Sequence, residues 1–360
     1  MKCGIVGLPN VGKSTLFNCL SNAKALAANY PFATIEPNIG VIPVPDHRLD
    51  VLAKMISPQN VQSAIVEIVD IAGLVKGASK GEGLGNKFLA NIRETNAIIH
   101  VLRCFEDSNI THVDGVINPV ADKETVEFEL QFKDLETLER RQESLKRIVK
   151  SGDKNALKEL AVIDQYHDHI SSGNSARSLI VDDHDCILKL NLLTNKPVLY
   201  VCNVDENSIN GNKYTAAVKT SLSTDDANML IISAAIEADI NELDSMSDKQ
   251  DFIEAIGLEE PGVNKVIKSA YSLLGLHTFF TAGEKEVRAW TIKKGALAPE
   301  AAGVIHTDFE TGFIRAEVIS YSDRINFQTE QACREAGKIH VEGKNYEVCD
   351  GDVIHFRFNV

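Results

Sequence analysis

Apolar, β-branched runs recur along this chain and mark the strands of a predicted sheet. The runs lie at 3–8, 62–72, 97–104, 197–203 and 229–235. Residues 14–24 have the apolar spacing of a helix instead, and helical stretches return near 237–275. Strands that alternate with helices form βαβ units on a parallel sheet. The pattern therefore predicts an α/β domain built on a parallel-rich sheet.

Between these strands the pattern changes to that of long amphipathic helices. Residues 128–149 repeat leucines and a valine at spacings near three, four and seven, which predicts one helix. Ser151-Gly152-Asp153 then supplies a glycine stop and an aspartate N-cap, and a second helix follows from Asn155. We expect a helical hairpin inserted into the α/β domain at 126–195.

From residue 277 onward the pattern is that of a small β-rich domain. Short strand signals are separated by Gly, Asp and Lys turns, and Asp350-Gly351 is typical of a hairpin turn. The predicted division of the chain is an α/β domain at 1–125 and 196–276, a helical insertion at 126–195 and a β-rich domain at 277–360.

Composition narrows the class of protein. The chain has 360 residues, 44% hydrophobic and 24% charged, which fits a globular protein of two or three domains. No apolar run approaches the ~18–20 residues of a membrane span, so we expect no membrane partner. Seven scattered cysteines without a CxxC pair favour reduced thiols and a cytoplasmic location. The net charge of −14 argues against broad nucleic-acid coating and is compatible with a local basic patch.

The motif GLPNVGKST at residues 7–15 matches GxxxxGK[ST] between a strand and a helix. In that setting the backbone N–H groups of the loop and the helix start hold a phosphate chain. Lys13 would reach the β- and γ-phosphates, and Ser14 would offer its hydroxyl to Mg²⁺. The alternative is a chance glycine turn. The predicted phosphate site comprises Asn10, Val11, Gly12, Lys13, Ser14 and Thr15.

The segment DIAG at residues 70–73 ends the strand-like run at 62–72 and suits a magnesium site. Asp70 would hold Mg²⁺ through a water, and the Gly73 N–H would reach the γ-phosphate, where Lys13 also acts catalytically. Thr34 lies between the two motifs and is the candidate switch threonine that closes on Mg²⁺.

The residue after DIAG is Leu74, where a Ras-like enzyme has a glutamine that orients the attacking water. Leucine cannot hydrogen-bond to water, so hydrolysis uses another group or stays slow until a partner supplies one. His112, in the loop beyond the next strand, is the candidate catalytic group. The alternative is an exposed loop histidine without a catalytic role.

Four segments occur in this order along the chain: GLPNVGKST, PFATIEPN, DIAGLVKGASKGEGLGNKFLANIRE and NVDE. In these segments the chain resembles the YchF/Obg-like ATPase family, in the Obg branch of translation-related P-loop GTPases. The resemblance covers essentially the whole chain. It implies that 126–195 is an inserted coiled coil and that 277–360 is a TGS domain of the β-grasp fold. It also implies a cytoplasmic, Mg²⁺-dependent nucleotide hydrolase that binds ribosomes and accepts ATP.

The resemblance also carries roles for single residues. It implies Mg²⁺ ligation at Ser14 and Thr34, and it matches His112 to the family's proposed catalytic histidine. Asn10 matches the asparagine through which related GTPases bind K⁺, so K⁺ is a second candidate cofactor.

The segment NVDE at 203–206 stands where a GTPase carries Asn-Lys-x-Asp to bind guanine. Val204 could pack on a purine but carries no cation, and the longer Glu206 misplaces the carboxylate. The Asn203 amide, a donor and an acceptor, could meet the edge of adenine, and Ser233 completes the predicted base site. Losing a bidentate base contact costs on the order of 1–3 kcal/mol, which erases a guanine preference without establishing an adenine preference.

Basic residues gather where the two predicted helices of the insertion meet. They are Arg140, Arg141, Lys146, Arg147, Lys150, Lys154 and Lys158. Such a tip on an acidic protein suits an anionic partner such as ribosomal RNA, and a solvated helix face is the alternative. We expect a monomeric ATPase that switches at the ribosome. Two other functions stay open: a nucleotide-sensing scaffold with negligible turnover, and a true GTPase.

We predict that the chain binds ATP at least as tightly as GTP, because the lysine and aspartate that enforce guanine are replaced at Val204 and Glu206. Titration of both labelled nucleotides against the protein measures this. A GTP preference of tenfold or more would contradict the prediction.

Overall fold

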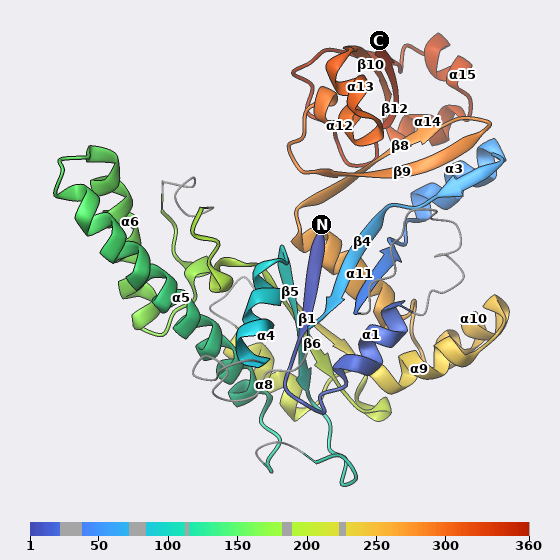
Figure 1. Ribbon diagram of the computed structural model, residues 1–360. Coiled ribbons are helices and arrows are strands. Elements are labelled where there is room, and N and C mark those ends of the chain that lie inside the picture. The colour runs from blue at the N-terminus through green and yellow to red at the C-terminus, as the bar shows by residue number, and fades with distance from the viewer. Residues whose placement is uncertain (22–37, 72–83, 112–114, 182–188, 223–227, 360) are drawn as a thin grey trace. The chain divides into compact units, whose positions relative to one another are not determined.

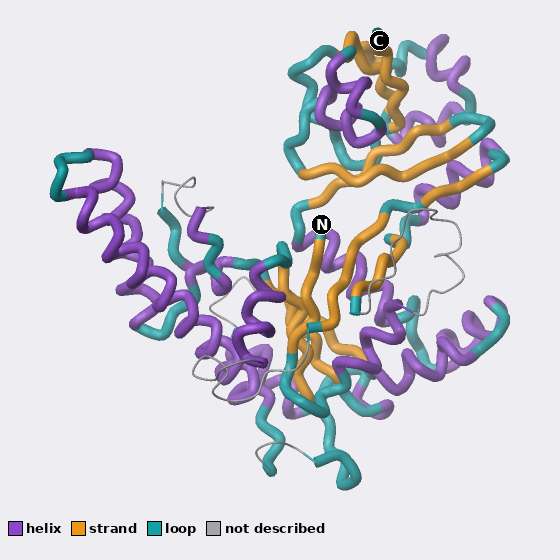
Figure 2. The backbone as a smooth tube through the Cα atoms, in the orientation of Figure 1, coloured by secondary structure: helices purple, strands orange, loops and turns teal. Residues whose placement is uncertain are grey.

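The computed structural model describes residues 1–21, 38–71, 84–111, 115–181, 189–222 and 228–359. The chain forms two compact units, each with its own six-stranded sheet (Figures 1 and 2). The first unit comprises Met1–Val41 and Glu67–Ala270, and the second comprises Ile42–Val66 and Tyr271–Val360.

The sheet of the first unit has the order β2-β4-β1-β5-β6-β7. Its strands are β1 (Lys2–Val6), β2 (Ile39–Pro43), β4 (Ile65–Asp70), β5 (Ala97–Arg103), β6 (Val198–Asn203) and β7 (Asn228–Ile232). β1 pairs in parallel with both β4 and β5, and β5, β6 and β7 continue the parallel pairing. Every residue of β5 and β6 is buried, as the apolar runs require. The predicted α/β class with a parallel-rich sheet is confirmed.

Helices cover both faces of this sheet (Figure 1). The helices of this unit outside residues 119–171 are α1 (Lys13–Ser21), α4 (Leu84–Arg93), α8 (Lys213–Ser221), α9 (Ala234–Glu242), α10 (Met246–Ala255), which packs on α9, and α11 (Gly262–Leu273). α1 packs beside α9 on one face, and α4 and α8 lie on the other. The chain order reverses at β1, which lies between β4 and β5. In such sheets ligands bind beyond the carboxyl ends of the strands at this switch point.

The predicted helical hairpin is present as α5 (Pro119–Val149) and α6 (Lys154–Ser171). The Asp153 carboxylate accepts from the N–H groups of Asn155 (2.8 Å) and Ala156 (3.2 Å), as expected of an N-cap. Leu138, Leu145, Ile163 and Tyr166 form its buried core. α5 begins seven residues before the expected boundary at 126, because Asn118 caps it and Pro119 occupies its first turn.

Buried polar contacts fix the base of the hairpin to the sheet. The fully buried Asp134 carboxylate accepts from the Leu193 N–H (2.7 Å), the Thr194 N–H (2.8 Å) and the Thr194 hydroxyl (2.7 Å). Glu127 accepts from Arg177 (2.8 Å) and from the Tyr200 hydroxyl in β6 (2.5 Å). The hairpin is therefore anchored to the strand that ends at Asn203.

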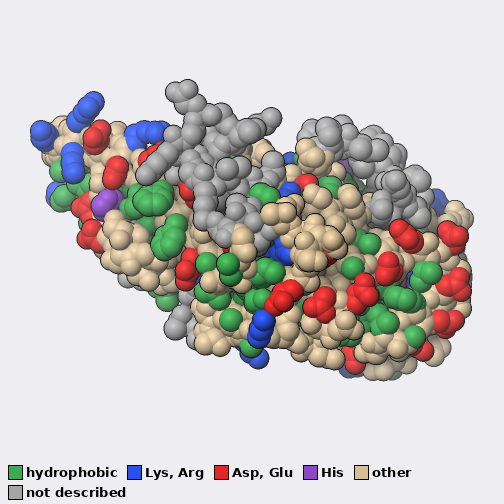
Figure 3. All heavy atoms as spheres, turned by 90° about the horizontal axis from the view of Figure 1, so that it is seen from below, with side chains coloured by type: hydrophobic (Ala, Val, Ile, Leu, Met, Phe, Trp, Pro, Cys, Tyr) green, Lys and Arg blue, Asp and Glu red, His purple; other side chains and the backbone are tan. Residues whose placement is uncertain are grey.

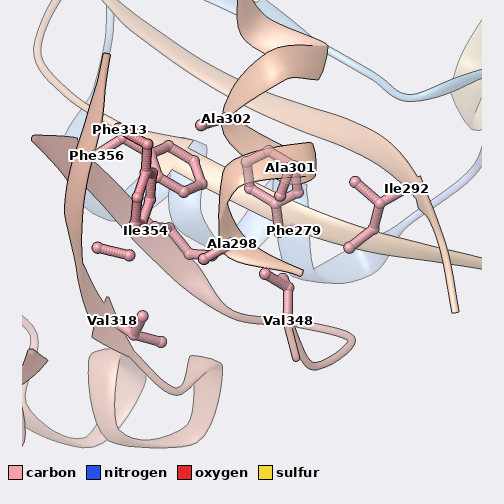
Figure 4. Close-up of a cluster of buried hydrophobic side chains, with 11 residues drawn as sticks. Phe279, Ile292, Ala298, Ala301, Ala302, Phe313, Val318, Val348, Ile354 and Phe356 are labelled. Atoms are coloured by element: carbon pink, nitrogen blue, oxygen red, sulfur yellow. The ribbon is translucent and has the colours of Figure 1, made fainter. Parts of the chain in front are cut away.

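The second unit is a mixed sheet in the order β11-β10-β12-β8-β9-β3. Its strands are β3 (Asn60–Gln62), β8 (Leu276–Ala282), β9 (Glu286–Lys293), β10 (Phe313–Ile319), β11 (His340–Glu342) and β12 (Val353–Phe358), and its helices are α3 (His47–Ile56), α12 (Ala298–Ile305), α13 (Thr307–Thr311), α14 (Tyr321–Phe327) and α15 (Glu330–Glu335). Figure 4 shows its core, in which Phe279, Phe313 and Phe356 pack against the alanines of α12. A β-rich unit therefore forms where the sequence predicts one.

Two details of this unit differ from expectation. Residues 42–66 pack with it, although the expected boundary placed them in the α/β domain, because β3 pairs with β9 and Arg48 bonds to Asp350 (2.6 Å). Asp350-Gly351 forms a turn but no hairpin, since β11 and β12 both pair with β10. The Asp350 carboxylate also accepts from the Thr278 N–H (2.8 Å), so this turn is hydrogen-bonded to β8.

Within the described residues, five of six free cysteines are buried and Cys349 is exposed, while Cys186 lies outside them. A search of the same residues for a helix long and apolar enough to cross a membrane finds none.

His100 of β5 is a buried histidine that faces cations. Burial, together with the charges of Lys123 and Arg177, lowers the pKa of His100 from 6.5 to about 3. Its Nε2 atom has no hydrogen-bond partner among the described residues. His100 is therefore held neutral in the folded protein.

We predict that His100→Phe flattens the acid dependence of the free energy of unfolding. Below pH 6.5 the unfolded chain binds a proton that folded His100 takes up only near pH 3, so acid favours unfolding. The stability present above pH 6.5 then falls by up to about 1.4 kcal/mol per pH unit. Urea unfolding at pH 7 and pH 5 measures the slope, and the exposed His340→Phe is the control. Equal slopes in His100→Phe and the wild type would refute the prediction.

Candidate nucleotide-binding site

A cleft of about 960 Å³ opens where the strands of the first sheet end. The loop after β1, Asp70 at the end of β4, the loops after β5 and β6 and the start of α9 all line it. The volume is in the range of small-molecule sites, and the position is the switch point of the sheet. The motifs at 7–15, 70 and 203–206 are therefore brought to one cleft, although they are far apart in sequence.

The glycine loop wraps into the start of α1. Asn10 and Gly12 adopt left-handed backbone with φ of 63° and 91°, and α1 begins at Lys13. Ser14 and Thr15, in the first turn, are exposed and line the cleft. The N–H groups of this first turn have no helical acceptor, so the loop presents donors where an anion would bind.

Lys13 and Asp70 form a salt bridge across the cleft. The Ser14 hydroxyl and the Asp70 carboxylate are hard oxygen donors of the kind that Mg²⁺ prefers, and both line the same cleft. The described residues hold no cluster of three or more His, Cys, Asp or Glu side chains that could bind a metal alone. The donor set fits a Mg²⁺ that takes few protein ligands and completes its shell with phosphate and water.

The Asn203 side chain joins three loops of the site. Its Nδ2 donates to the Val11 carbonyl (2.9 Å), and its Oδ1 accepts from the Ala234 N–H (2.9 Å). One N–H and one lone pair are then left on this amide for a base. A Cβ on Gly12 would lie 2.2 Å from Asn203 Nδ2, so this loop requires glycine for space as well as for its φ. The structure thus uses Asn203 chiefly to hold the loops.

The other predicted base residues fall in different places. Val204 lines the cleft and is buried, and its N–H donates to the Ile232 carbonyl (2.8 Å). Glu206 lines the cleft and is exposed. Asp205 caps the turn that Glu206 begins, since its carboxylate accepts from the Asn207 N–H (3.0 Å). Ser233 is buried as the N-cap of α9 and is not among the lining residues.

The loop after β5 adds a wall that the sequence motifs did not indicate. Phe105, Glu106, Asp107 and Ile110 line the cleft. Hydrogen bonds from Lys213 and Tyr214 hold the pKa of Glu106 below its usual range. The sequence could have indicated this wall only by its position, because these residues follow a predicted buried strand at the edge of the sheet where ligands bind.

The Asn10 side chain connects the glycine loop to the residue that follows this wall, because its Nδ2 donates to the Thr111 carbonyl (3.1 Å). Its Oδ1 is the atom that a K⁺ ion would use. Four residues with expected roles, Thr34, Gly73, Leu74 and His112, lie outside the described residues.

Two family models match the chain. Residues 2–149 match the 50S ribosome-binding GTPase family, and residues 276–359 match a YchF-GTPase carboxyl-terminal family described as a protein of unknown function, DUF933. The "Ribosome-binding ATPase YchF" of Haemophilus ducreyi is 55% identical over 100% of this chain and 99% of its own length. The protein of the same name from Bacillus subtilis is 49% identical over 100% of both chains.

A solved structure is also that of a YchF protein. The "YchF GTPase" of Schizosaccharomyces pombe matches with a TM-score of 0.91 and 37% identity, over 99% of this chain and 97% of that one. A GTP-binding protein of Pyrococcus horikoshii, with a TM-score of 0.61 and 21% identity, shares the fold.

We predict that Gly12→Ala abolishes nucleotide binding, whereas Gly152→Ala does not. Both glycines have left-handed φ (91° and 87°), so alanine adds roughly 1–2 kcal/mol of strain at either. Only at Gly12 does the new Cβ collide with Asn203, since nothing lies within 4 Å at Gly152. Fluorescent-nucleotide titration at matched folded fraction measures binding. Equal affinities of the two variants would show that the Asn203 contact is dispensable.

Proposed function

This chain belongs to the YchF family, and from that premise we propose that it is a ribosome-associated P-loop nucleotide hydrolase that binds and slowly hydrolyses ATP. The observation that carries the proposal is the convergence of the α1 N-terminus, Lys13, Asp70 and the 203–206 loop on one cleft. A cleft with phosphate donors at one end and a base loop at the other has the chemistry of a nucleoside triphosphate site.

The residues divide into roles along this cleft. The N–H groups of Gly12 to Thr15 and the Lys13 ammonium hold the phosphates and stabilise the charge that develops on them during transfer. The salt bridge between Lys13 and Asp70 holds the ammonium in the cleft that both residues line.

Mg²⁺ fits the Ser14 hydroxyl, with Thr34 as a second ligand and Asp70 acting through water. When bound, Mg²⁺ supplies neutralisation of phosphate charge. The Gly73 N–H would meet the γ-phosphate and His112 would act on the attacking water. Asn10 supports K⁺ as a further cation, since its Oδ1 is not used in the contact with Thr111.

ATP is the proposed nucleotide, and GTP is a second substrate. Val204 provides an apolar surface for a purine, and Glu206 provides an acceptor at the mouth of the cleft. Ser233, which is buried as a helix cap, would act through its position next to Ala234 rather than through direct contact.

The names of the relatives support the ribosome as a partner. We infer a cytoplasmic monomer that binds the ribosome, through ribosomal RNA or protein, as a nucleotide-dependent switch in translation or the stress response. The proposed division is a nucleotide-binding domain at 1–125 and 196–276, a coiled coil at 126–195 and a TGS domain at 277–360. The basic tip of α5 and α6 supports RNA as the contact: all seven cations are exposed, and Figure 3 shows basic side chains gathered at one end of the molecule.

Phosphate release under multiple turnover tests this function. We expect slow ATP hydrolysis that requires Mg²⁺ and rises with ribosomes, and we expect His112→Ala to lose most of this activity while ATP binding is kept. Turnover that stays at background with and without ribosomes would favour the nucleotide-sensing scaffold instead. Unchanged single-turnover cleavage in His112→Ala would remove the histidine from the mechanism.

The ribosome contact has its own test. Lys150→Gln with Lys154→Gln should weaken ribosome cosedimentation and lower its salt slope by about 1.4–1.8, at roughly 0.7–0.9 per phosphate contact. Lys219→Gln with Lys294→Gln removes two exposed charges elsewhere and is the matched control. A slope that changes equally in both double variants would exclude the tip as a specific contact.

A further inference from the structure

Arg103, the last residue of β5, is a buried arginine with only 1% of its surface exposed. Burying a guanidinium is costly unless its N–H groups are hydrogen-bonded. We therefore asked which backbone groups its N–H groups bind and whether those groups belong to the lining of the cleft.

The guanidinium of Arg103 donates to three backbone carbonyls of the next loop. Nε donates to Phe105 (3.3 Å), Nη1 to Ile110 (3.0 Å) and Nη2 to Asp107 (3.3 Å). The Phe105 ring also lies over the guanidinium, with its centroid 4.7 Å from Cζ. One side chain therefore sets the course of the loop from residue 105 to residue 110.

The same loop is held from its outer side by the start of α8. The Asn212 amide donates to the Cys104 carbonyl (2.7 Å), and the Tyr214 hydroxyl donates to the Glu106 carboxylate (2.6 Å). Lys213 forms a salt bridge with Glu106 (2.8 Å). We call residues 105–110 the β5 wall.

The β5 wall lies beside the loop that meets the base. The Cys104 N–H donates to the Asn203 carbonyl (2.8 Å), which joins the start of the wall to the start of the 203–206 loop. Phe105, Glu106, Asp107 and Ile110 line the same cleft as Val204 and Glu206 and as Lys13 and Ser14 of the glycine loop. The start of the wall, at Phe105 and Glu106, therefore lies beside the 203–206 loop, where we place the nucleoside, whereas its end at Ile110 precedes Thr111, which Asn10 of the glycine loop contacts (3.1 Å).

We propose that Arg103 is a positioning residue that sets the β5 wall for the base and ribose of the bound nucleotide. The inference rests on the proposed function of the cleft and adds to it a group that no sequence motif includes. Arg103 acts through the carbonyls it holds and does not itself line the cleft.

Lysine cannot replace this residue. The planar guanidinium directs donors toward three carbonyls at once, whereas an ammonium is a point donor on a flexible stem. Arg103→Lys keeps the charge and most of the apolar stem, so it removes chiefly the fork geometry. It is therefore the sharpest substitution for the test.

The experiment compares two probes of the same cleft by competition titration. ATP reports on both ends of the cleft, and inorganic tripolyphosphate reports on the phosphate end alone. We expect Arg103→Lys to weaken ATP binding about tenfold and to leave tripolyphosphate within twofold of wild type. In steady-state assays KM for ATP should rise while kcat changes little, because ground-state and transition-state binding are lost equally.

Arg324→Lys is the matched control, since Arg324 is also a buried arginine bonded to a backbone carbonyl, that of Gln328, in the second unit. It should leave both affinities unchanged. An unchanged ATP affinity in Arg103→Lys, or an equal loss for ATP and tripolyphosphate, would overturn the proposal. If wild type itself fails to bind ATP, the proposed function fails instead.

A second variant keeps the test decisive if Arg103→Lys does not fold. Tyr214→Phe removes only the hydroxyl that holds Glu106 at the outer side of the wall. We expect a two- to fivefold loss of ATP affinity without a change for tripolyphosphate. In that case an unchanged ATP affinity in Tyr214→Phe would overturn the proposal.

Discussion

The cleft depends on the buried amide of Asn203, which joins the glycine loop through Val11 and the start of α9 through Ala234. Each such hydrogen bond contributes about 0.5–1.5 kcal/mol, but losing the amide would leave a buried carbonyl and a buried N–H unpaired at a larger cost. The contact also explains why residue 12 has no side chain, because a Cβ there would meet the amide. The glycine loop, the 203–206 loop and the start of α9 are therefore geometrically linked through one side chain.

The two central strands, β5 and β6, connect the cleft to the helical hairpin. β5 ends at Arg103, which shapes the β5 wall, and β6 ends at Asn203, which holds the glycine loop. Three residue pairs earlier in these strands, His100 lies opposite Tyr200, and the Tyr200 hydroxyl bonds to Glu127 of α5. Because β5 and β6 are buried along their whole length, the base of the hairpin and the cleft share a stiff support. A basic tip at the end of that hairpin is thus anchored to the strands whose following loops line the cleft.

Much of this could be predicted from local patterns. The apolar runs gave the strands of the parallel sheet, and the Asp153 cap and Gly152 stop placed the turn of the hairpin within a residue. The phosphate motif was readable because its chemistry is confined to nine consecutive residues. The role of Asn203 was less accessible: its sequence position indicated a base contact, whereas its two protein partners lie 192 and 31 residues away. The packing of residues 42–66 with the second unit was hidden for the same reason, since Arg48 meets Asp350 across 302 positions.

The sequence by itself determined the fold class, the phosphate loop, the hairpin and the family, because each is written in periodicity or in contiguous motifs. Only the tertiary structure decided which side chains face the ligand and which hold the loops that do. Ser233 and Asn203 are predicted to contact the nucleotide base. In the structure Ser233 is the N-cap of α9, and the Asn203 side chain hydrogen-bonds to the glycine loop. The sequence gives no indication of a role for Arg103, because it is a single arginine at the end of an apolar strand. Buried polar groups must find partners, and which partners are within reach is settled only when distant segments pack together.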